Sequence, residues 1–333
     1  MNGGFLRQAR VVIVIGKGGV GKTTVSAALA RAASLAGLDS LVVEIEGKGG
    51  LTSAFEYPDE LDYREVVLHA GDKAKGEGDV RGRTLRADEA LVEYLENHAM
   101  GRLSKRLLSG GAIDVVATAV PGIKDILVLG KVKQLEREHP ADLIVLDAPA
   151  SGHAISFLAG AAGLLDAVRA GPIRAQAQDV VDLLTDEARC QVLVVTLAEE
   201  MPVNEAAEVA AAIEDRVGAH LGPVIVNGVY PPRPSLPDTD AAEELAAASS
   251  IHLRPGEART LDSAARSRRG RQALQRSHLD RLSRVLPLPQ VVLPFLFTAS
   301  VGRAELDLLA RAIATSLETL ACPGDPDVMK GLA

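Results

Sequence analysis

The segment that most constrains the fold of this chain is VVIVIGKGGVGKTT, at residues 11–24. It opens with an unbroken run of β-branched residues, Val11–Ile15, which is typical of a parallel strand buried on both faces. A glycine-rich stretch follows, and the alanine-rich residues after it favour a helix that ends near Gly37. A strand, a glycine loop and a helix in this order predict an α/β fold with a mainly parallel sheet.

The glycine-rich stretch matches the phosphate-binding pattern G-x-x-x-x-G-K-[ST] and stands in the strand–loop–helix context that this pattern requires. Its glycines let backbone N–H groups turn inward around phosphate oxygens, and the helix N-terminus adds a favourable dipole. Lys22 is expected to contact the β- and γ-phosphates of ATP, and the Thr23 hydroxyl to bind Mg²⁺. The predicted phosphate-binding residues are Gly16, Gly18, Gly19, Val20, Gly21, Lys22, Thr23 and Thr24.

A second part of this site is predicted at DLIVLD, residues 142–147. This apolar strand ends in Asp147, which places a carboxylate at the carboxyl edge of the sheet, where the phosphate loop also lies. From there Asp147 is expected to reach Mg²⁺ through a water molecule. ATP and Mg²⁺ are therefore the predicted cofactors.

The rest of the chain continues the alternation of strand and helix. Helices are predicted at 174–187, 202–217 and 302–320, and further strands at 40–46, 191–197, 222–228 and 289–295. Because helices separate most strands, both faces of the sheet are expected to be covered, as in a three-layer P-loop NTPase fold.

Two stretches depart from this alternation. Residues 58–85 are charged and glycine-rich toward their end, which predicts an exposed hairpin or a mobile loop. Residues 86–135 have a helical pattern without a convincing strand and are interpreted as a helical insertion. The chain is expected to form one P-loop ATPase domain over residues 1–325, with a flexible tail at 326–333.

Lys17 is a second lysine in the loop, outside the general pattern, and is either solvated or functional. KGGVGKT, residues 17–23, resembles the deviant phosphate loop of the signature-lysine ATPases, among them MinD, ParA, the nitrogenase iron protein and the arsenite-pump and guided-entry ATPases. The resemblance implies that Lys17 reaches across a dimer interface to the partner's nucleotide and acts in catalysis with Lys22.

LDAPASGHAISFL, residues 146–158, is similar to switch II of the arsenite-pump and guided-entry branch, the anion-transporting ATPase family. The similarity implies switch roles for Gly152 and His153, although His153 also fits an ordinary polar loop position. The chain looks like a shorter bacterial branch of this family.

Two segments resemble the family's base-binding elements. VIVNGV, residues 224–229, is similar to a strand that ends in an adenine-reading Asn, here Asn227, whose amide can donate to and accept from the base. The alternative is that Asn227 caps a turn. LPFLFTASVGRAEL, residues 293–306, resembles the adenine loop and implies contacts from Pro294 and Phe295.

Switch I departs from the family pattern S-T-D-P-A-H. The stretch EIEGKGGLTSAF, residues 44–55, aligns without a gap and puts Glu46 at the position of the water-orienting Asp and Gly47 at the Pro. Glu44, two residues upstream, is an alternative. Because a glutamate is one methylene longer, hydrolysis is expected to be slow, altered or shared with a partner subunit.

Several classes of function are disfavoured. A net charge of −8 gives no support for nonspecific nucleic-acid binding, and the first apolar run is too short to span a bilayer. The acidic, proline-containing tail argues against a membrane-binding helix, so a cytoplasmic chain without a stable membrane anchor is expected. Cys190 and Cys322 form no C-x-x-C motif, which argues against a zinc clasp or a metalloid site.

The resemblance implies an ATP-hydrolysing dimer, formed with an identical chain or a paralogue, in which the nucleotide opens and closes a helical client-binding region. Two alternatives stand beside it: a ParA- or MinD-like partitioning or positioning ATPase, and a weakly active regulatory subunit paired with a paralogue. The apolar residues of the insertion either line a groove for a hydrophobic protein client or form its core. These residues are Leu91, Val92, Leu95, Leu103, Leu107, Leu108, Ile113, Val115 and Val116.

Overall fold

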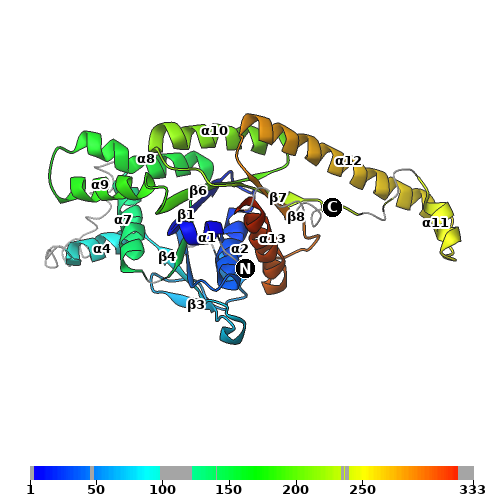
Figure 1. The fold of residues 1–333 in the computed structure, drawn as a ribbon, viewed down its shortest axis with the longest axis horizontal. Coiled ribbons are helices and arrows are strands. Elements are labelled where there is room, and N and C mark those ends of the chain that lie inside the picture. The colour runs from blue at the N-terminus through cyan, green and yellow to red at the C-terminus, as the bar shows by residue number, and fades with distance from the viewer. Residues whose placement is uncertain are drawn as a thin grey trace.

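The structure, a computed structural model, describes residues 4–45, 49–97, 122–139, 141–233, 236 and 240–321. Within these residues an eight-stranded sheet has the order β3-β4-β2-β5-β1-β6-β7-β8 (Figure 1). Every neighbouring pair is parallel except β3 and β4. The strands are β1 Val11–Gly16, β2 Ser40–Ile45, β3 Val66–His69, β4 Val80–Leu85, β5 Leu143–Asp147, β6 Cys190–Leu197, β7 Val224–Val229 and β8 Gln290–Pro294. The predicted α/β fold is confirmed.

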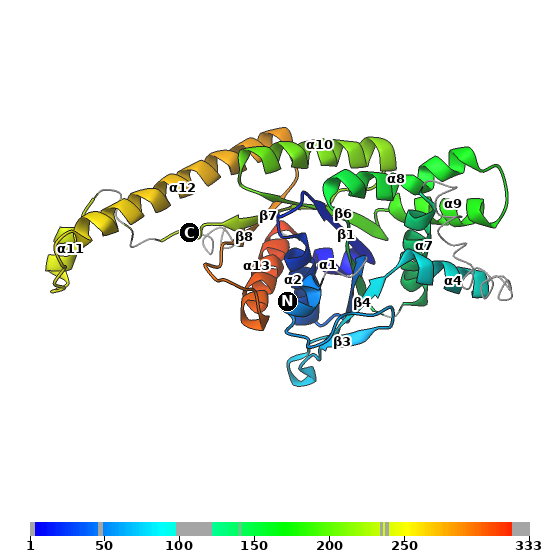
Figure 2. The same cartoon turned by 180° about the vertical axis from the view of Figure 1, so that it is seen from behind.

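Helices cover both faces of this sheet, as expected for a three-layer fold (Figures 1 and 2). The helices are α1 Gly4–Gln8, α2 Lys22–Leu35, α3 Gly50–Ala54, α4 Ala87–Asn97, α7 Ile123–Glu138, α8 Ser151–Ala167, α9 Pro172–Leu184, α10 Glu200–Val217, α11 Ala242–Ala248, α12 Glu257–Val285 and α13 Arg303–Ala321. A 3₁₀ turn, η1, covers Lys73–Lys75. Gly37 has a left-handed φ of 80° just beyond α2, as the sequence predicts for a helix C-terminus.

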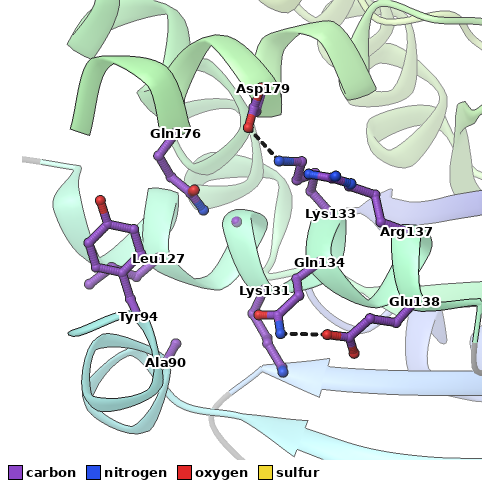
Figure 3. A pocket seen from close by; sticks show the side chains of 11 residues that line it. Ala90, Tyr94, Leu127, Lys131, Lys133, Gln134, Arg137, Glu138, Gln176 and Asp179 are labelled. Atoms are coloured by element: carbon purple, nitrogen blue, oxygen red, sulfur yellow. Dashed lines mark hydrogen bonds and ion pairs between the residues drawn. The ribbon is translucent and has the colours of Figure 1, made fainter. Parts of the chain in front are cut away.

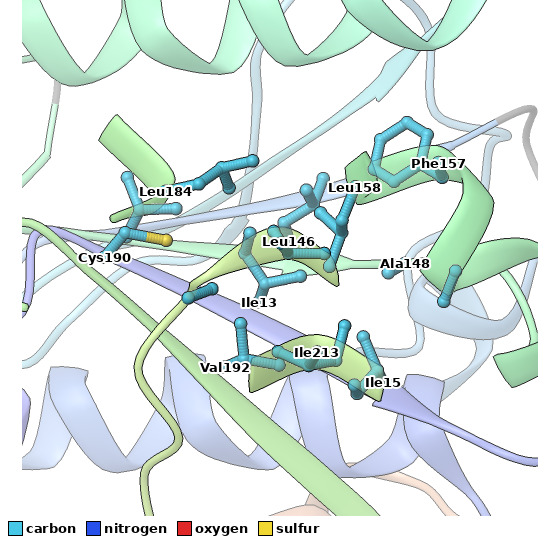
Figure 4. Packing of buried hydrophobic residues seen from close by; sticks show 14 of the residues in the cluster. Ile13, Ile15, Leu146, Ala148, Phe157, Leu158, Leu184, Cys190, Val192 and Ile213 are labelled. Atoms are coloured by element: carbon cyan, nitrogen blue, oxygen red, sulfur yellow. The ribbon is translucent and has the colours of Figure 1, made fainter. Parts of the chain in front are cut away.

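Each face of the central strands builds its own hydrophobic core, because successive side chains of a strand point to opposite faces. On one face, Ile13 and Val192 of β1 and β6 lie beside Phe157 and Leu158 of α8 (Figure 4). On the other face, Val12 and Val14 of β1 pack with the buried residues of α2 and α13. Strand β1 is therefore buried on both sides, which fixes the position of the glycine loop that follows it.

The prediction that residues 58–85 form an exposed hairpin or mobile loop is only partly right. A hairpin is present, but its second strand, β4, is buried and pairs in parallel with β2. Arg81 and Arg83 make this stretch of the sequence resemble a solvent-exposed segment rather than a buried strand. Both pair with Glu65, and the Arg83 guanidinium also lies 4.6 Å from the centre of the Tyr63 ring. Pairing of this kind makes the burial of charged side chains tolerable.

Helix α12 is 29 residues long. Its C-terminal part packs beside α10, and its N-terminal part projects away from the body with α11 at its far end (Figures 1 and 2). Gln275 and Leu282 are the buried residues of α12.

The helical insertion is described only at its two ends, by α4 and α7. Residues 98–121 and the tail predicted at 326–333 lie outside the described residues. None of the described helices combines the length and apolar composition needed to cross a bilayer. Cys190 is buried with a free thiol, and burial raises the pKa of this thiol to about 12, whereas Cys322 lies outside the described residues.

Candidate nucleotide-binding site

The glycine loop lies at the carboxyl end of β1, between β5 and β6. The connection that leaves β1 runs toward β2, and the connection that leaves the neighbouring β5 runs in the opposite direction along the sheet, toward β6. In open α/β sheets, ligands bind in the crevice at such a switch point. Two glycines are required by close contacts. A Cβ on Gly16 would clash with the Val195 carbonyl oxygen, and one on Gly21 would clash with the Asn227 amide nitrogen. A Cβ on Gly18 or Gly19 would meet no atom within 4 Å, so the loop is tightly packed at its ends and open at its tip.

Lys22 is the first residue of α2, and Gly21, the N-cap residue before it, has no side chain to cap the helix. The Lys22 amine donates to the Lys17 carbonyl oxygen at 3.1 Å, so it folds back over the loop. An uncapped helix N-terminus with a lysine at its first position fits an anion such as a phosphate group.

Asp147 ends β5 and is only 3% exposed. One of its oxygens accepts from the Thr23 hydroxyl at 2.6 Å, and the other accepts from the Ser26 hydroxyl at 3.2 Å. The predicted pair Thr23 and Asp147 therefore meets. Ser26 was missed by sequence reasoning, although its place one turn after Thr23 on α2 is a usable signal.

Glu44 lies directly beside Asp147, because β2 and β5 pair in parallel with these two residues in register. It is 2% exposed, and its Oε1 accepts from the Thr84 hydroxyl at 2.7 Å. Its Oε2 is buried and has no hydrogen-bond partner among the residues that the structure describes. Two buried carboxylates and a threonine hydroxyl at one sheet edge form an oxygen donor set that suits Mg²⁺.

The remaining switch I residues, Glu46 and Gly47, lie outside the described residues, as does Lys48. Gly50, at the start of α3, lies beside the phosphate loop, because a Cβ on Gly50 would be 2.8 Å from the Thr23 methyl group.

A cavity of about 330 Å³ adjoins the loop on its other side and contains the predicted base-binding residues Asn227, Pro294 and Phe295. The Asn227 amide donates to the Val20 carbonyl oxygen at 2.9 Å and so ties β7 to the loop. Thr24, predicted with the phosphate residues, also lines this cavity. Gly228, Leu296, Phe297, Thr298 and Val301 also line this cavity and lie within the two predicted base-binding segments. Lining residues outside those segments, which the sequence reasoning missed, are Leu197, Glu199, Arg271 and Leu309.

Phe295 and Phe297 of this cavity form an aromatic cluster with Tyr230, with ring centres 4.8–5.2 Å apart. The Arg268 guanidinium lies 5.0 Å from the Phe297 ring centre and 5.4 Å from that of Tyr230. Phe297 has a φ of +48°, which is unusual for an aromatic residue, so the surrounding contacts hold a strained backbone at the cavity wall.

Lys17 contacts a charged side chain as well as solvent. Its amine is 2.5 Å from the Glu205 carboxylate of α10 in the same chain. Sequence reasoning missed Glu205, because 188 residues separate the pair.

Gly152 and His153 lie in the first turn of α8 rather than in an extended switch loop, and both are exposed. The His153 backbone N–H donates to the Ala150 carbonyl oxygen at 2.8 Å. Helix α8 begins four residues after Asp147, so the two residues are connected to the metal-side carboxylate by a short segment.

The fold and the site together define an ATPase of the P-loop class. A family model of the anion-transporting ATPases matches residues 9–169. ATPase BagA of Mycobacterium tuberculosis is 34% identical over 235 residues, which cover 68% of this chain and 67% of BagA. ATPase GET3 of Podospora anserina is 26% identical over 153 residues, which cover 46% of this chain and 43% of GET3. The chain belongs to the anion-transporting ATPase family.

Proposed function

We propose that this ATPase works as a dimeric switch, in which Mg·ATP binding and hydrolysis change the arrangement of its helical region. The observation that carries this proposal is the convergence of Lys22, Thr23 and Asp147 around an open glycine loop. These are the groups that hold phosphate and metal in P-loop enzymes. The proposed partner is a second copy of this chain or a paralogue.

In this proposal, Mg²⁺ held at this site would supply positive charge to offset that of the phosphate oxygens. The Thr23 hydroxyl would bind the metal, and Asp147 and Glu44 would hold its water ligands. The buried Glu44 Oε2, which has no hydrogen-bond partner among the described residues, supports this role for Glu44, because a buried unpaired carboxylate oxygen is costly unless a cation or a donor satisfies it.

Glu46 is the proposed residue that orients the attacking water, in place of the aspartate of the family pattern. Glu44 remains the alternative for this role. Its bond from Thr84 holds it within β2, so the proposal places it on the metal side and leaves the water to Glu46. If neither carboxylate orients water well, the chain is the weakly active regulatory subunit considered above.

Asn227, Pro294 and Phe295 are proposed to bind the adenine base in the 330 Å³ cavity. Aromatic and proline faces can stack on a base, and the Asn227 side chain already has one hydrogen bond to the loop. Base binding at Asn227 would therefore act directly on Val20 of the phosphate loop.

Lys17 is proposed to act across the dimer interface. Its side chain is 40% exposed although it is paired with Glu205, so it is accessible to a second chain. A lysine supplied in this way neutralises charge that develops during phosphoryl transfer and makes hydrolysis depend on assembly.

Movement is proposed to pass from Asp147 through α8 to α7 and α9, which pack against it. A cavity of about 520 Å³ lies between α4, α7 and α9 (Figure 3). Its lining includes two buried lysines, of which Lys131 pairs with Glu93 at 2.5 Å and Lys133 pairs with Asp179. Because charged side chains line part of this cavity, the proposed contact for any hydrophobic client stays with the apolar residues of the insertion named in the sequence analysis.

The experiment that tests the proposal measures ATP turnover per chain together with the oligomeric state over a range of protein concentrations. We expect the rate per chain to rise with concentration along the same curve as the fraction of dimer in Mg·ATP. Turnover that is equal at every dilution would contradict the proposal. Repeating the measurement with an added paralogue separates a weakly active subunit from a self-sufficient enzyme.

A further inference from the structure

Lys17 and Glu205 form a close contact between the phosphate loop and α10. The two side chains are 40% and 29% exposed, and their charged atoms are 2.5 Å apart. Only Glu205 Oε1 faces the amine. Glu205 Oε2 is buried and has no hydrogen-bond partner among the described residues, so Lys17 is the partner on which this carboxylate depends.

Helix α10 holds Glu205 firmly in place. The neighbouring residue Asn204 accepts from the Arg281 guanidinium of α12 at 2.6 Å, and Glu199 pairs with Arg271 of the same helix at 2.8 Å. Buried residues of α10 on either side of Glu205, Val203 and Ala206, belong to the core. Because its helix is anchored, Glu205 can restrain a side chain from the loop.

Lys17 is restrained at a second point. Its carbonyl oxygen accepts from the Lys22 amine at 3.1 Å. If Lys22 turned its amine toward a phosphate oxygen and gave up this bond, the contact with Glu205 would be the remaining one of these two restraints on residue 17.

We propose that Glu205 is a positioning residue that holds the Lys17 amine within its own chain and releases it when a second chain presents an anionic nucleotide. The proposal rests on the function proposed above, because the group that replaces Glu205 is a phosphate bound by the partner. Two anions, one in each chain, therefore compete for one amine. Nucleotide binding by Lys22 in the same chain weakens the restraint and so links loading to assembly.

The contact is partly exposed, so its free energy is small. Exposed ion pairs contribute up to about 1 kcal/mol, which corresponds to a change of up to about fivefold in an equilibrium constant. A restraint of this size favours the state in which Lys17 contacts Glu205 without preventing its release, as a reversible switch requires.

The first measurement is the rate at which a brief pulse of an amine-acylating reagent modifies Lys17, read by mass spectrometry. The protein is free of nucleotide and diluted, so the result does not depend on a dimer. We expect modification about twofold to fivefold faster in Glu205→Gln than in the unaltered chain. The matched control is Glu208→Gln, which removes an exposed carboxylate from the same helix.

Two other kinds of lysine serve as internal references. Lys131 and Lys133 are buried, and faster modification of both would show that Glu205→Gln loosens the whole fold. Lys75 is exposed and should react equally in all chains. An unchanged rate at Lys17, or a rise shared with Lys131 and Lys133, would overturn the proposal.

The second measurement is the dimer dissociation constant in Mg·ATP, from sedimentation. We expect Glu205→Gln to lower it about twofold to fivefold, and to change nothing in a Lys17→Ala background. An effect of equal size in both backgrounds would identify a purely structural role and overturn the proposal. A chain that stays single at every concentration, while Lys17 modification still responds to Glu205→Gln, would instead overturn the proposed dimeric function.

Discussion

The Thr23 hydroxyl donates to the Asp147 carboxylate across 2.6 Å, although 124 residues separate them in the chain. The bond joins the first turn of α2 to the end of β5 and brings the two halves of the proposed metal site into contact. Asp147 is buried, so this pairing also satisfies a carboxylate that would otherwise be costly to enclose.

Replacing Asp147 by asparagine should separate binding from hydrolysis. The Asn oxygen can still accept a hydrogen bond from Thr23, but the charge that holds the metal's water ligands is gone. We expect Mg²⁺-dependent turnover to fall about 100-fold, with ATP affinity in the absence of Mg²⁺ nearly unchanged. Steady-state kinetics and equilibrium binding check this, and an unchanged turnover would exclude Asp147 from the metal site.

Glu44→Gln should slow hydrolysis without weakening the fold. A buried neutral amide is less costly than a carboxylate with one unpaired oxygen, so thermal stability should be equal or higher. We expect turnover to fall at least about tenfold, as for loss of one electrostatic contact in an active site. Lower stability with normal turnover would show instead that Glu44 has only a structural role beside Thr84.

Gly21→Ala should damage the phosphate loop, because Gly21 has a φ of +90° and a Cβ there would clash with Asn227. The left-handed backbone alone costs about 1–2 kcal/mol for alanine. We expect a lower melting temperature and at least about tenfold weaker ATP binding, since each 1.4 kcal/mol is a factor of ten. Gly18→Ala is the matched control, because its Cβ would meet nothing within 4 Å. Equal behaviour of the two variants would contradict the loop geometry.

Asn227→Ala should reduce discrimination between ATP and GTP. Loss of a side chain that hydrogen-bonds a base typically removes about 1–3 kcal/mol, because polar groups are left unpaired. Competition binding with the two nucleotides measures the preference. A preference equal to that of the unaltered chain would mean that Asn227 only ties β7 to the loop through Val20.

Acid should loosen the junction between α4 and α7 through Glu93. Burial pushes the pKa of this carboxyl upward, but hydrogen bonds from Lys131 and Tyr63 outweigh it and hold the pKa below its ordinary value of 4.5. The folded-state pKa is therefore below the unfolded one, so this stabilisation is present above about pH 4.5 and is lost as the pH falls through the folded-state value. Melting curves should show Glu93→Gln less stable at pH 7, with the difference shrinking on acidification. A difference that is constant with pH would contradict this assignment.

The central strands and the phosphate loop were predictable because their signals are local. Val11–Ile15 is uniformly β-branched, and the glycine pattern follows at once. Strand β4 was not predictable in the same way, because Arg81 and Arg83 look solvent-exposed until Glu65 and Tyr63 are placed beside them. Tertiary pairing overrides local polarity there.

The candidate site also contains residues with a local sequence signal and residues whose role depends on tertiary packing. Lys22, Thr23, Asp147 and Asn227 stand at the ends of recognisable elements, and the structure brings them to one edge of the sheet. Glu205 stands in the middle of an ordinary amphipathic helix. Nothing near it in the sequence indicates that it faces Lys17, since that contact depends on how α10 packs over the sheet.

The central claim, that one chain's Lys17 completes its partner's nucleotide site, is tested most directly by mixing two inactive chains, Lys17→Ala and Lys22→Ala. In a mixed dimer, the nucleotide held by the Lys17→Ala chain keeps its own Lys22 and receives Lys17 from the other chain, so that site is intact. We predict that an equal mixture recovers about a quarter of normal turnover, because half of the dimers are mixed and each has one intact site. No recovery, with mixed dimers shown to form, would contradict the account.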